Sequence, residues 1–168
     1  DIMENRYTLM TKVAITGHMN GLGKAFARLL PNTIGFDIMD NYVGSYDITK
    51  DYNQIAEKAH DCDVFINNAY DGRGQILMHH AIEEQYQHTD KLIINISSLT
   101  TDLYPDRNDQ YAQVKRNLEK ISRHARCRCE CIQVPLMNTQ LANGIKHAKT
   151  HKINADIVAK AIIQWHIS

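Results

Sequence analysis

Short apolar runs alternate along the chain with longer stretches in which apolar residues recur at helical spacing. The short runs predict six strands, at residues 12–16, 33–36, 42–46, 63–66, 92–96 and 129–134. The longer stretches predict five helices, at residues 22–30, 50–60, 75–87, 110–123 and 154–167, the last with Asn154 as its N-cap. Strands that alternate with helices are typical of an α/β protein with a parallel sheet.

One connection in this pattern is abbreviated. Only residues 38–41 separate the second and third predicted strands, which is too few for the crossover helix that a parallel pair usually needs. The rest of the chain contains no internal repeat, low-complexity tract or linker. We therefore expect a single domain over residues 10–168, preceded by residues 1–9 as an upstream extension or a cloning remnant.

Composition and charge exclude several classes of protein. The 19 Lys and Arg balance 19 Asp and Glu, so no basic field is present to attract nucleic acid. A hydrophobic content of 43% without net charge is not typical of a disordered chain. No apolar run reaches the roughly 20 residues of a membrane-spanning helix. We expect a soluble cytoplasmic protein, in which Cys62 and the alternating Cys127, Cys129 and Cys131 are packed, reduced thiols.

A glycine-rich segment joins the first predicted strand to the first helix. Its sequence is Thr16-Gly17-His18-Met19-Asn20-Gly21-Leu22-Gly23. Glycines let the backbone turn sharply and approach a pyrophosphate, while the N-terminal N–H groups of the next helix favour the phosphates. Asp37, at the end of the second strand, can accept hydrogen bonds from an adenosine ribose. The segment and Asp37 together predict a dinucleotide site.

A second group of polar residues follows the fifth predicted strand. Ser97-Ser98 follow directly on that strand, and after twelve intervening residues Tyr111-Ala112-Gln113-Val114-Lys115 opens a helix. Tyr111 and Lys115 share a helix face, and Ser98 can meet them at the carboxyl edge of the sheet. Because a nearby ammonium stabilises a phenolate, this set is suited to proton transfer.

These motifs together resemble those of the short-chain dehydrogenases/reductases, and the resemblance extends over nearly the whole chain from Met10 onward. The glycine segment fits the family pattern Thr-Gly-x-x-x-Gly-x-Gly, and the Ser and Tyr-x-x-x-Lys spacing fits its catalytic signature. The resemblance implies adenine contacts from Asp47 and Ile48 and further cofactor contacts from Asn68, Ala69, Pro135 and Thr139. Tyr70 departs from the family, which usually has glycine there. The implied fold is a Rossmann-type doubly wound parallel sheet of about six strands, abridged by one crossover helix and the C-terminal strand.

The activity that the resemblance implies is hydride transfer between a nicotinamide and an alcohol or carbonyl carbon. Tyr111 would act as general acid or base, Ser98 would polarise the substrate oxygen, and Lys115 would hold the nicotinamide ribose. Asp37 would repel a 2′-phosphate, and the variable positions of the glycine segment carry no Lys or Arg, so NAD(H) is favoured over NADP(H). We expect a small-molecule substrate and a homodimer or homotetramer.

Several positions leave alternatives open. Residues 75–88 contain no Asn to extend the proton relay, so His79 or His80 could serve there or could simply be a surface pair. The basic stretch 140–153 is either a lid for an anionic substrate or a solvated face, and its His147 and His151 lack the further ligands of a metal site. Two other functions fit the motifs: a non-catalytic dinucleotide sensor, and an epimerase or dehydratase that works through transient oxidation.

Overall fold

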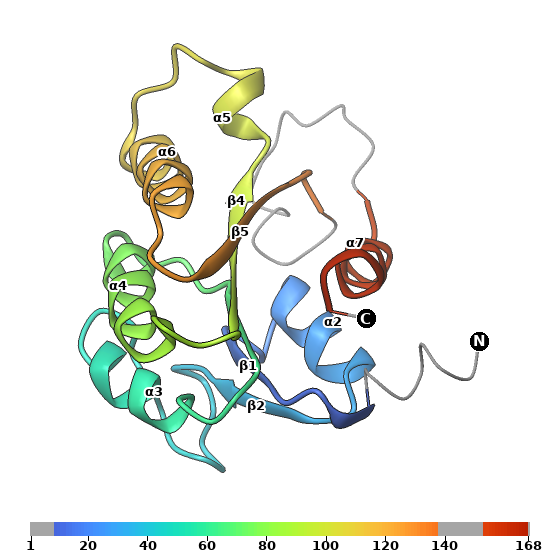
Figure 1. Ribbon diagram of the computed structural model, residues 1–168. Helices are drawn as coiled ribbons and strands as arrows, with labels where there is room; N and C mark the ends of the chain where they lie inside the picture. The colour runs from blue at the N-terminus through green and yellow to red at the C-terminus, as the bar shows by residue number, and fades with distance from the viewer. Residues whose placement is uncertain (1–8, 138–152, 168) are drawn as a thin grey trace.

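A computed structural model of the protein describes residues 9–137 and 153–167. In these residues one parallel sheet lies between two layers of helices (Figure 1). The elements in chain order are β1 (Val13–Thr16), α2 (Gly21–Leu29), β2 (Thr33–Phe36), α3 (Tyr52–Lys58), β3 (Val64–Asn67), α4 (Gly74–Tyr86), β4 (Leu92–Ser98), α5 (Thr100–Leu103), α6 (Gln110–Arg123), β5 (Arg128–Val134), α7 (Ala155–Ile162) and a π-helical turn (Ile163–Ile167).

The sheet has five strands in the order β2-β1-β3-β4-β5, and all neighbouring strands are parallel. Because helices cover both faces, a central strand is buried along its whole length, as all seven residues of β4 are. The strand order reverses direction at β1, with β2 on one side and β3 on the other. In open α/β sheets, ligands bind beyond the carboxyl ends of the strands at such a point.

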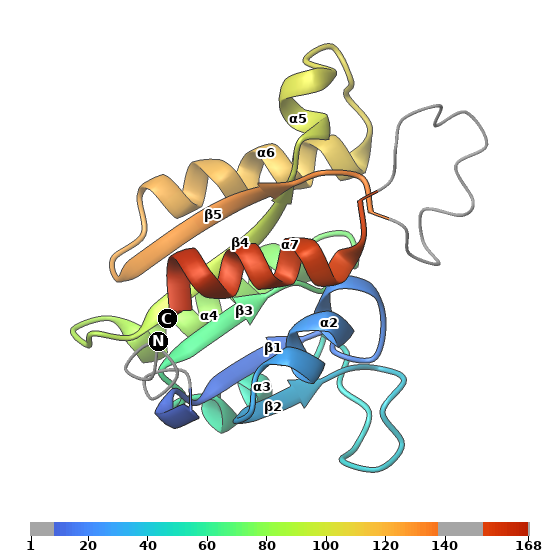
Figure 2. The same ribbon diagram turned by 90° about the vertical axis from the view of Figure 1, so that its right-hand side faces the viewer.

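Two apolar cores hold the layers together. On one face, α2 and α7 pack on the sheet through residues such as Phe26 and Ile162 (Figure 2). On the other face, α3 and α4 supply residues such as Ile55, Met78 and Ile82. The inner strands β1, β3 and β4 contribute to both cores, because their successive side chains point to opposite faces.

The expected strand at residues 42–46 is wrong, and the described residues form five strands rather than six. The Asp40 carboxylate accepts hydrogen bonds from the backbone N–H groups of Tyr42 and Val43, at 2.9 and 3.1 Å, which closes a turn there. Tyr42 is 99% exposed, so the apolar residues of this segment bury no strand face. The short connection after β2 therefore leaves out the strand as well as its crossover helix.

The other elements agree with the sequence to within a few residues at their ends. The Asn154 side chain accepts a hydrogen bond from the Asp156 N–H at 2.8 Å, which confirms it as the N-cap of α7. The short helix α5 was not predicted. Residues 153–167 hold only an isolated bridge at Ile153, α7 and the π-helical turn, and thus no further strand of the sheet. None of the helices described is both long and apolar enough to cross a membrane.

Candidate functional site

A cleft of about 500 Å³ lies beyond the carboxyl ends of the strands, on the side where the sequence places its motifs. Eleven of the expected site residues line it: Gly17, Asn20, Gly21, Leu22, Asp37, Asp47, Ile48, Asn68, Ala69, Tyr111 and Lys115. Five others lie outside the lining: His18, Met19, Gly23, Ser98 and Pro135. Thr139 and the stretch 140–152 lie outside the described residues.

The glycine turn forms one wall of the cleft. Gly17 has a φ of +74° and Gly21 a φ of +54°, a backbone region that favours glycine. A Cβ atom on Gly23 would lie 2.0 Å from the Gly17 carbonyl oxygen, so only glycine lets α2 begin this close to the turn. The side chain of the N-cap residue Asn20 makes no capping hydrogen bond, and the first turn of α2 holds no acidic residue. The N-terminal N–H groups of α2 and its positive dipole end are therefore placed to favour an anion.

The residues after β2 are fastened to the glycine turn. The two carboxylate oxygens of Asp37 accept hydrogen bonds from the N–H groups of Met19 and Met39, at 3.0 and 2.9 Å. His18 lies against Gly35, and its Nε2 is 3.1 Å from Asp40 Oδ2. Backbone hydrogen bonds from Val43 and Tyr42 lower the pKa of Asp40. His18 and Met19 thus lie outside the cleft lining and hold the segment after β2, whereas the Asp37 carboxylate lines the cleft.

Asp47 and Ile48 also line the cleft. The Asp47 carboxylate accepts hydrogen bonds from the hydroxyl and the N–H of Thr49, at 2.6 and 2.8 Å, and these lower its pKa. Ile48 is buried and packs so closely on Gly74 that a Cβ there would lie 2.7 Å from its side chain. The cleft therefore combines two carboxylates with apolar walls.

Thr16 and Asn68 join the turns that follow β1 and β3. The Thr16 hydroxyl oxygen accepts hydrogen bonds from the N–H groups of Asn68 and Ala69, at 3.0 and 3.1 Å. In return, Asn68 Nδ2 donates to the Thr16 carbonyl oxygen at 3.1 Å. These bonds fix the middle of the cleft floor.

Tyr111 and Lys115 place a phenol and an amine in the cleft, at the end away from Asp37. They lie one turn apart on α6, whose start is capped by the Asp109 carboxylate through the Ala112 N–H. Lys115 Nζ is 5.5 Å from the centre of the Tyr111 ring and 5.6 Å from that of Tyr70. The two rings meet edge to face, with centres 4.9 Å apart. One ammonium thus faces two phenol rings.

Burial sets the charge states in this part of the site. It lowers the pKa of Lys115 from 10.5 to about 8, because the side chain is only 3% exposed. Burial and the neighbouring Tyr111 raise the pKa of Tyr70, which is therefore a neutral phenol at pH 7. At neutral pH this end of the cleft holds one desolvated positive charge beside the neutral phenol of Tyr70.

The structure does not bring Ser98 into the cleft lining. Its hydroxyl donates to Thr100 Oγ1 at 2.9 Å and accepts from the Thr100 N–H at 3.2 Å. The preceding residue, Ser97, does line the cleft, and its hydroxyl donates to Glu119 on α6. Neighbouring residues of a strand point to opposite faces, so Ser97 and Ser98 serve different sides of the sheet.

Gln75 was not predicted as a site residue, yet its side chain contacts Lys115 directly. Its side-chain oxygen accepts a hydrogen bond from Lys115 Nζ at 2.8 Å, and the Ile96 carbonyl oxygen accepts a second at 2.8 Å. Gln75 comes six residues after Ala69, at the start of α4, and is fully buried. The one feature of the sequence that could have pointed to Gln75 is its position: it is a polar residue in the first turn of a helix whose other residues are mostly apolar.

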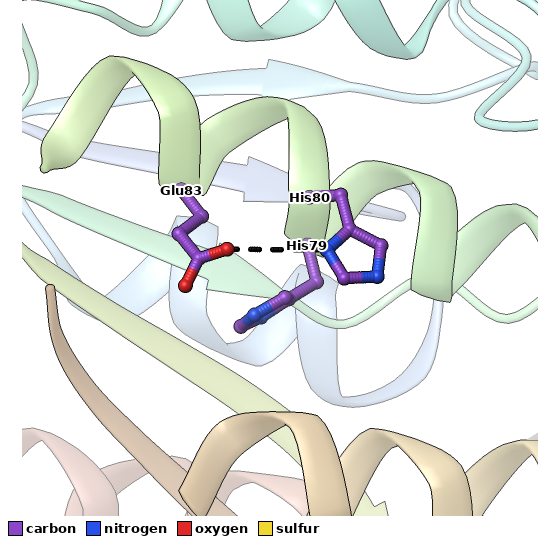
Figure 3. A group of neighbouring side chains, drawn as sticks. All are labelled: His79, His80 and Glu83. Carbon is purple, nitrogen blue, oxygen red and sulfur yellow. Dashed lines mark ion pairs between the residues drawn. The ribbon is translucent and has the colours of Figure 1, made fainter. Parts of the chain in front are cut away.

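His79 and His80, the relay candidates, lie farther along α4 and do not line the cleft. Figure 3 shows them beside Glu83, and together they are the one group of potential metal ligands among the described residues. His79 is buried, which lowers its pKa, and its Nδ1 lies 2.8 Å from Asn95 Nδ2. The Glu83 carboxylate accepts the Arg126 N–H at 2.6 Å. These contacts tie α4 to β4 and to the start of β5.

Comparisons with known proteins agree with this architecture. The sequence matches no protein-family model and no curated protein. Solved structures do match: a short-chain dehydrogenase from Burkholderia cenocepacia J2315 in complex with NADP has a TM-score of 0.76 at 16% identity, over 93% of this chain and 84% of its own. A 3-ketoacyl-(acyl-carrier-protein) reductase from Brucella melitensis complexed with NADH has a TM-score of 0.71 at 16% identity, over 93% and 91%.

An alcohol dehydrogenase from the archaeon Thermococcus sibiricus complexed with 5-hydroxy-NADP adds a third match, with a TM-score of 0.73 at 17% identity over 90% and 88% of the two chains. All three matches run along nearly the whole of this chain, with its five-stranded sheet and flanking helices. This protein therefore has the α/β Rossmann-type fold of the short-chain dehydrogenases/reductases, in an abridged form.

Proposed function

We propose that the protein is an oxidoreductase that uses a nicotinamide dinucleotide to interconvert an alcohol and a carbonyl group. The observation that carries this proposal is the shared cleft: Tyr111 and Lys115 line the same cavity as the glycine turn and Asp37. A dinucleotide is long enough to need both ends of such a cleft. The solved structures with the same fold were obtained with NADP, NADH or a modified NADP, which supports the proposal.

The residues present fit such a cofactor. Gly17 and Gly21 have the positive φ values that let the turn bend sharply, and the start of α2 offers unpaired N–H groups to a pyrophosphate. Asp37 and Asp47 offer carboxylates at the adenosine end. When bound, the cofactor supplies the hydride chemistry, and the protein supplies placement and electrostatics.

The chain's own residues would transfer the proton, hold the ribose and polarise the substrate oxygen. Tyr111 donates a proton to the substrate oxygen in reduction and accepts one in oxidation. The Lys115 ammonium lies 5.5 Å from the centre of the Tyr111 ring, in the cleft lining, where it would hold the ribose hydroxyls. Ser98 would polarise the substrate oxygen only after its hydroxyl leaves Thr100, because that is its partner in this structure.

NAD(H) is the cofactor that we propose over NADP(H). The carboxylate of Asp37 lines the adenosine end and would repel a 2′-phosphate. Lys115 is the only Lys or Arg among the described residues that line the cleft, and it lies at the opposite end. A small molecule is the proposed substrate, and a homodimer or homotetramer the proposed assembly.

A screen for NAD(H)-linked turnover tests the proposed function. Alcohols, sugars and small carbonyl compounds are offered to the wild type and to Tyr111→Phe, with NADH absorbance as the readout. We expect at least one compound to be turned over by the wild type and not by the variant. Equal rates in both proteins for every compound would contradict the enzymatic function.

A dinucleotide sensor without turnover is the second candidate. It is favoured by one observation, the engagement of the Ser98 hydroxyl with Thr100 outside the cleft lining. The two candidates share cofactor binding and differ in turnover, so the same screen separates them. NADH binding without turnover of any compound would favour the sensor.

A further inference from the structure

Gln75 is a fully buried amide at the junction of α4, β3, β4 and α6. Its Nε2 donates to the carbonyl oxygens of Asn67 and Ile96, at 2.9 and 3.0 Å. Its Oε1 accepts from Lys115 Nζ at 2.8 Å. Its backbone carbonyl oxygen accepts from Asn67 Nδ2, also at 2.9 Å. Every polar group of this side chain therefore has a partner.

This set of partners fixes the orientation of the amide. Both neighbours of Nε2 are carbonyl oxygens, which only accept hydrogen bonds, and the neighbour of Oε1 is an ammonium, which only donates. A rotated amide would place an NH₂ group against the ammonium and an oxygen against two oxygens. Gln75 consequently presents one acceptor of fixed direction to Lys115.

Both acceptors that hold the ammonium, Gln75 Oε1 and the Ile96 carbonyl oxygen, are neutral. A neutral acceptor fixes the position of a charged donor without cancelling its charge. A carboxylate at the same place would form a buried ion pair and direct the field of the ammonium away from the cleft.

We propose that Gln75 is a positioning residue, which holds the Lys115 ammonium against the Tyr111 and Tyr70 rings while leaving its positive charge available to the cleft. The catalytic meaning of this arrangement rests on the proposed function, whereas the contact itself does not. The two residues of this contact are 40 positions apart in the sequence.

Four titratable groups face Lys115 besides its amide partner. Tyr111 and Glu119 lie on α6, Tyr70 lies in the loop after β3, and Cys131 lies on β5. Glu119 also accepts hydrogen bonds from the Ser97 and Thr101 hydroxyls, at 2.5 and 2.9 Å. A substitution at Gln75 leaves all four groups in place, so its effect on Lys115 can be separated from theirs.

The test is a pH titration of the Lys115 side chain by NMR of protein labelled with ¹⁵N-lysine, in which Lys115→Arg assigns the signal. In Gln75→Glu, the new carboxylate should raise the pKa of Lys115 by about 1 to 3 from its value of about 8. In Gln75→Met, the loss of the acceptor should lower this pKa further, because burial is no longer offset. The matched control is Gln113→Glu, an exposed residue of α6 bound to Asn108, which should leave the titration of Lys115 unchanged.

A Lys115 titration that is the same in Gln75→Glu, in Gln113→Glu and in the wild type would overturn the proposal. If Gln75→Met does not fold, the comparison of the two Glu variants still decides. No cofactor or substrate is needed, so this result is independent of the proposed function. Once a substrate is known, Gln75→Glu should shift the pH profile of kcat, whereas a merely structural role would lower kcat equally at every pH.

Discussion

The two ends of the cleft are built in different ways. At the end near Asp37, the glycine turn and the start of α2 present mainly backbone groups, and even the Asp37 carboxylate is held by backbone N–H groups. At the other end, the buried side chains of Lys115 and Gln75 and the half-buried Tyr111 form a network between α6 and α4. The first end depends on local backbone conformation, and the second on contacts between elements distant in sequence.

This difference predicts two kinds of loss. Damage to the glycine turn should abolish cofactor binding, and damage to the side-chain network should abolish turnover while binding persists. Each of the following changes affects one end only.

The largest effect is expected for Tyr111→Phe, which removes the hydroxyl that, in the proposed function, gives its proton to the substrate oxygen. With any substrate that the wild type reduces, kcat should fall by about 1,000-fold, within the range of general acid catalysis. The dissociation constant for NADH, measured by fluorescence, should stay within about threefold, since the ring remains. Retention of more than a tenth of the wild-type kcat would show that another group supplies the proton.

Gly23→Ala should produce the next largest effect, at the opposite end. The added methyl group would lie 2.0 Å from the Gly17 carbonyl oxygen, so α2 must move away from the turn. We expect NADH affinity to fall by about 100-fold, or about 3 kcal/mol. The control is Lys24→Ala, the next and exposed residue of α2, which should bind NADH as the wild type does. Equal affinity in both variants would contradict the role of the turn.

Lys115→Met should reveal the cost of burying the ammonium. The pKa of Lys115 is lowered from 10.5 to about 8 in the folded protein, so the unfolded chain holds the proton more tightly. The resulting penalty is fully present below pH 8 and disappears as the pH rises past 10.5. The free energy of unfolding of the variant minus that of the wild type should therefore be more positive at pH 7 than at pH 10, by about 2 to 3 kcal/mol. Urea unfolding at both pH values measures this, and a difference of zero or opposite sign would refute it.

Asp37→Asn should have the smallest effect and a selective one. It removes the charge that opposes a 2′-phosphate and keeps an amide oxygen that can still accept a hydrogen bond. The ratio of NADPH to NADH dissociation constants should fall by about tenfold, or about 1.4 kcal/mol, by isothermal titration calorimetry. If both affinities change by the same factor, Asp37 does not select the cofactor.

The contrast between the two ends also explains what the sequence could predict. The glycine turn and Asp37 were identifiable because a local backbone conformation needs particular residues at fixed spacing. Tyr111 and Lys115 were identifiable because one helix turn joins them. Gln75 was not, since its partner is 40 residues away and only the packing of α4 on α6 brings the two together.

In the fold, too, the features that depend on contacts between elements could not be predicted from the sequence. Buried strands such as β4 were predicted because both faces need apolar residues. Residues 42–46 include the strand-forming Tyr42, Val43 and Tyr46, but in the structure they pair with no strand of the sheet. The position of the Ser98 hydroxyl depends on a contact with Thr100 that no spacing rule contains.

The central claim is that this cleft binds a nicotinamide dinucleotide through the glycine turn. Calorimetric titration of NADH into the wild type, Gly23→Ala and Tyr111→Phe tests it most directly, because it needs no substrate. We predict saturable binding of one NADH per chain to the wild type and Tyr111→Phe, and about 100-fold weaker binding to Gly23→Ala. Absence of binding to the wild type at millimolar NADH, or equal binding by all three proteins, would contradict the claim.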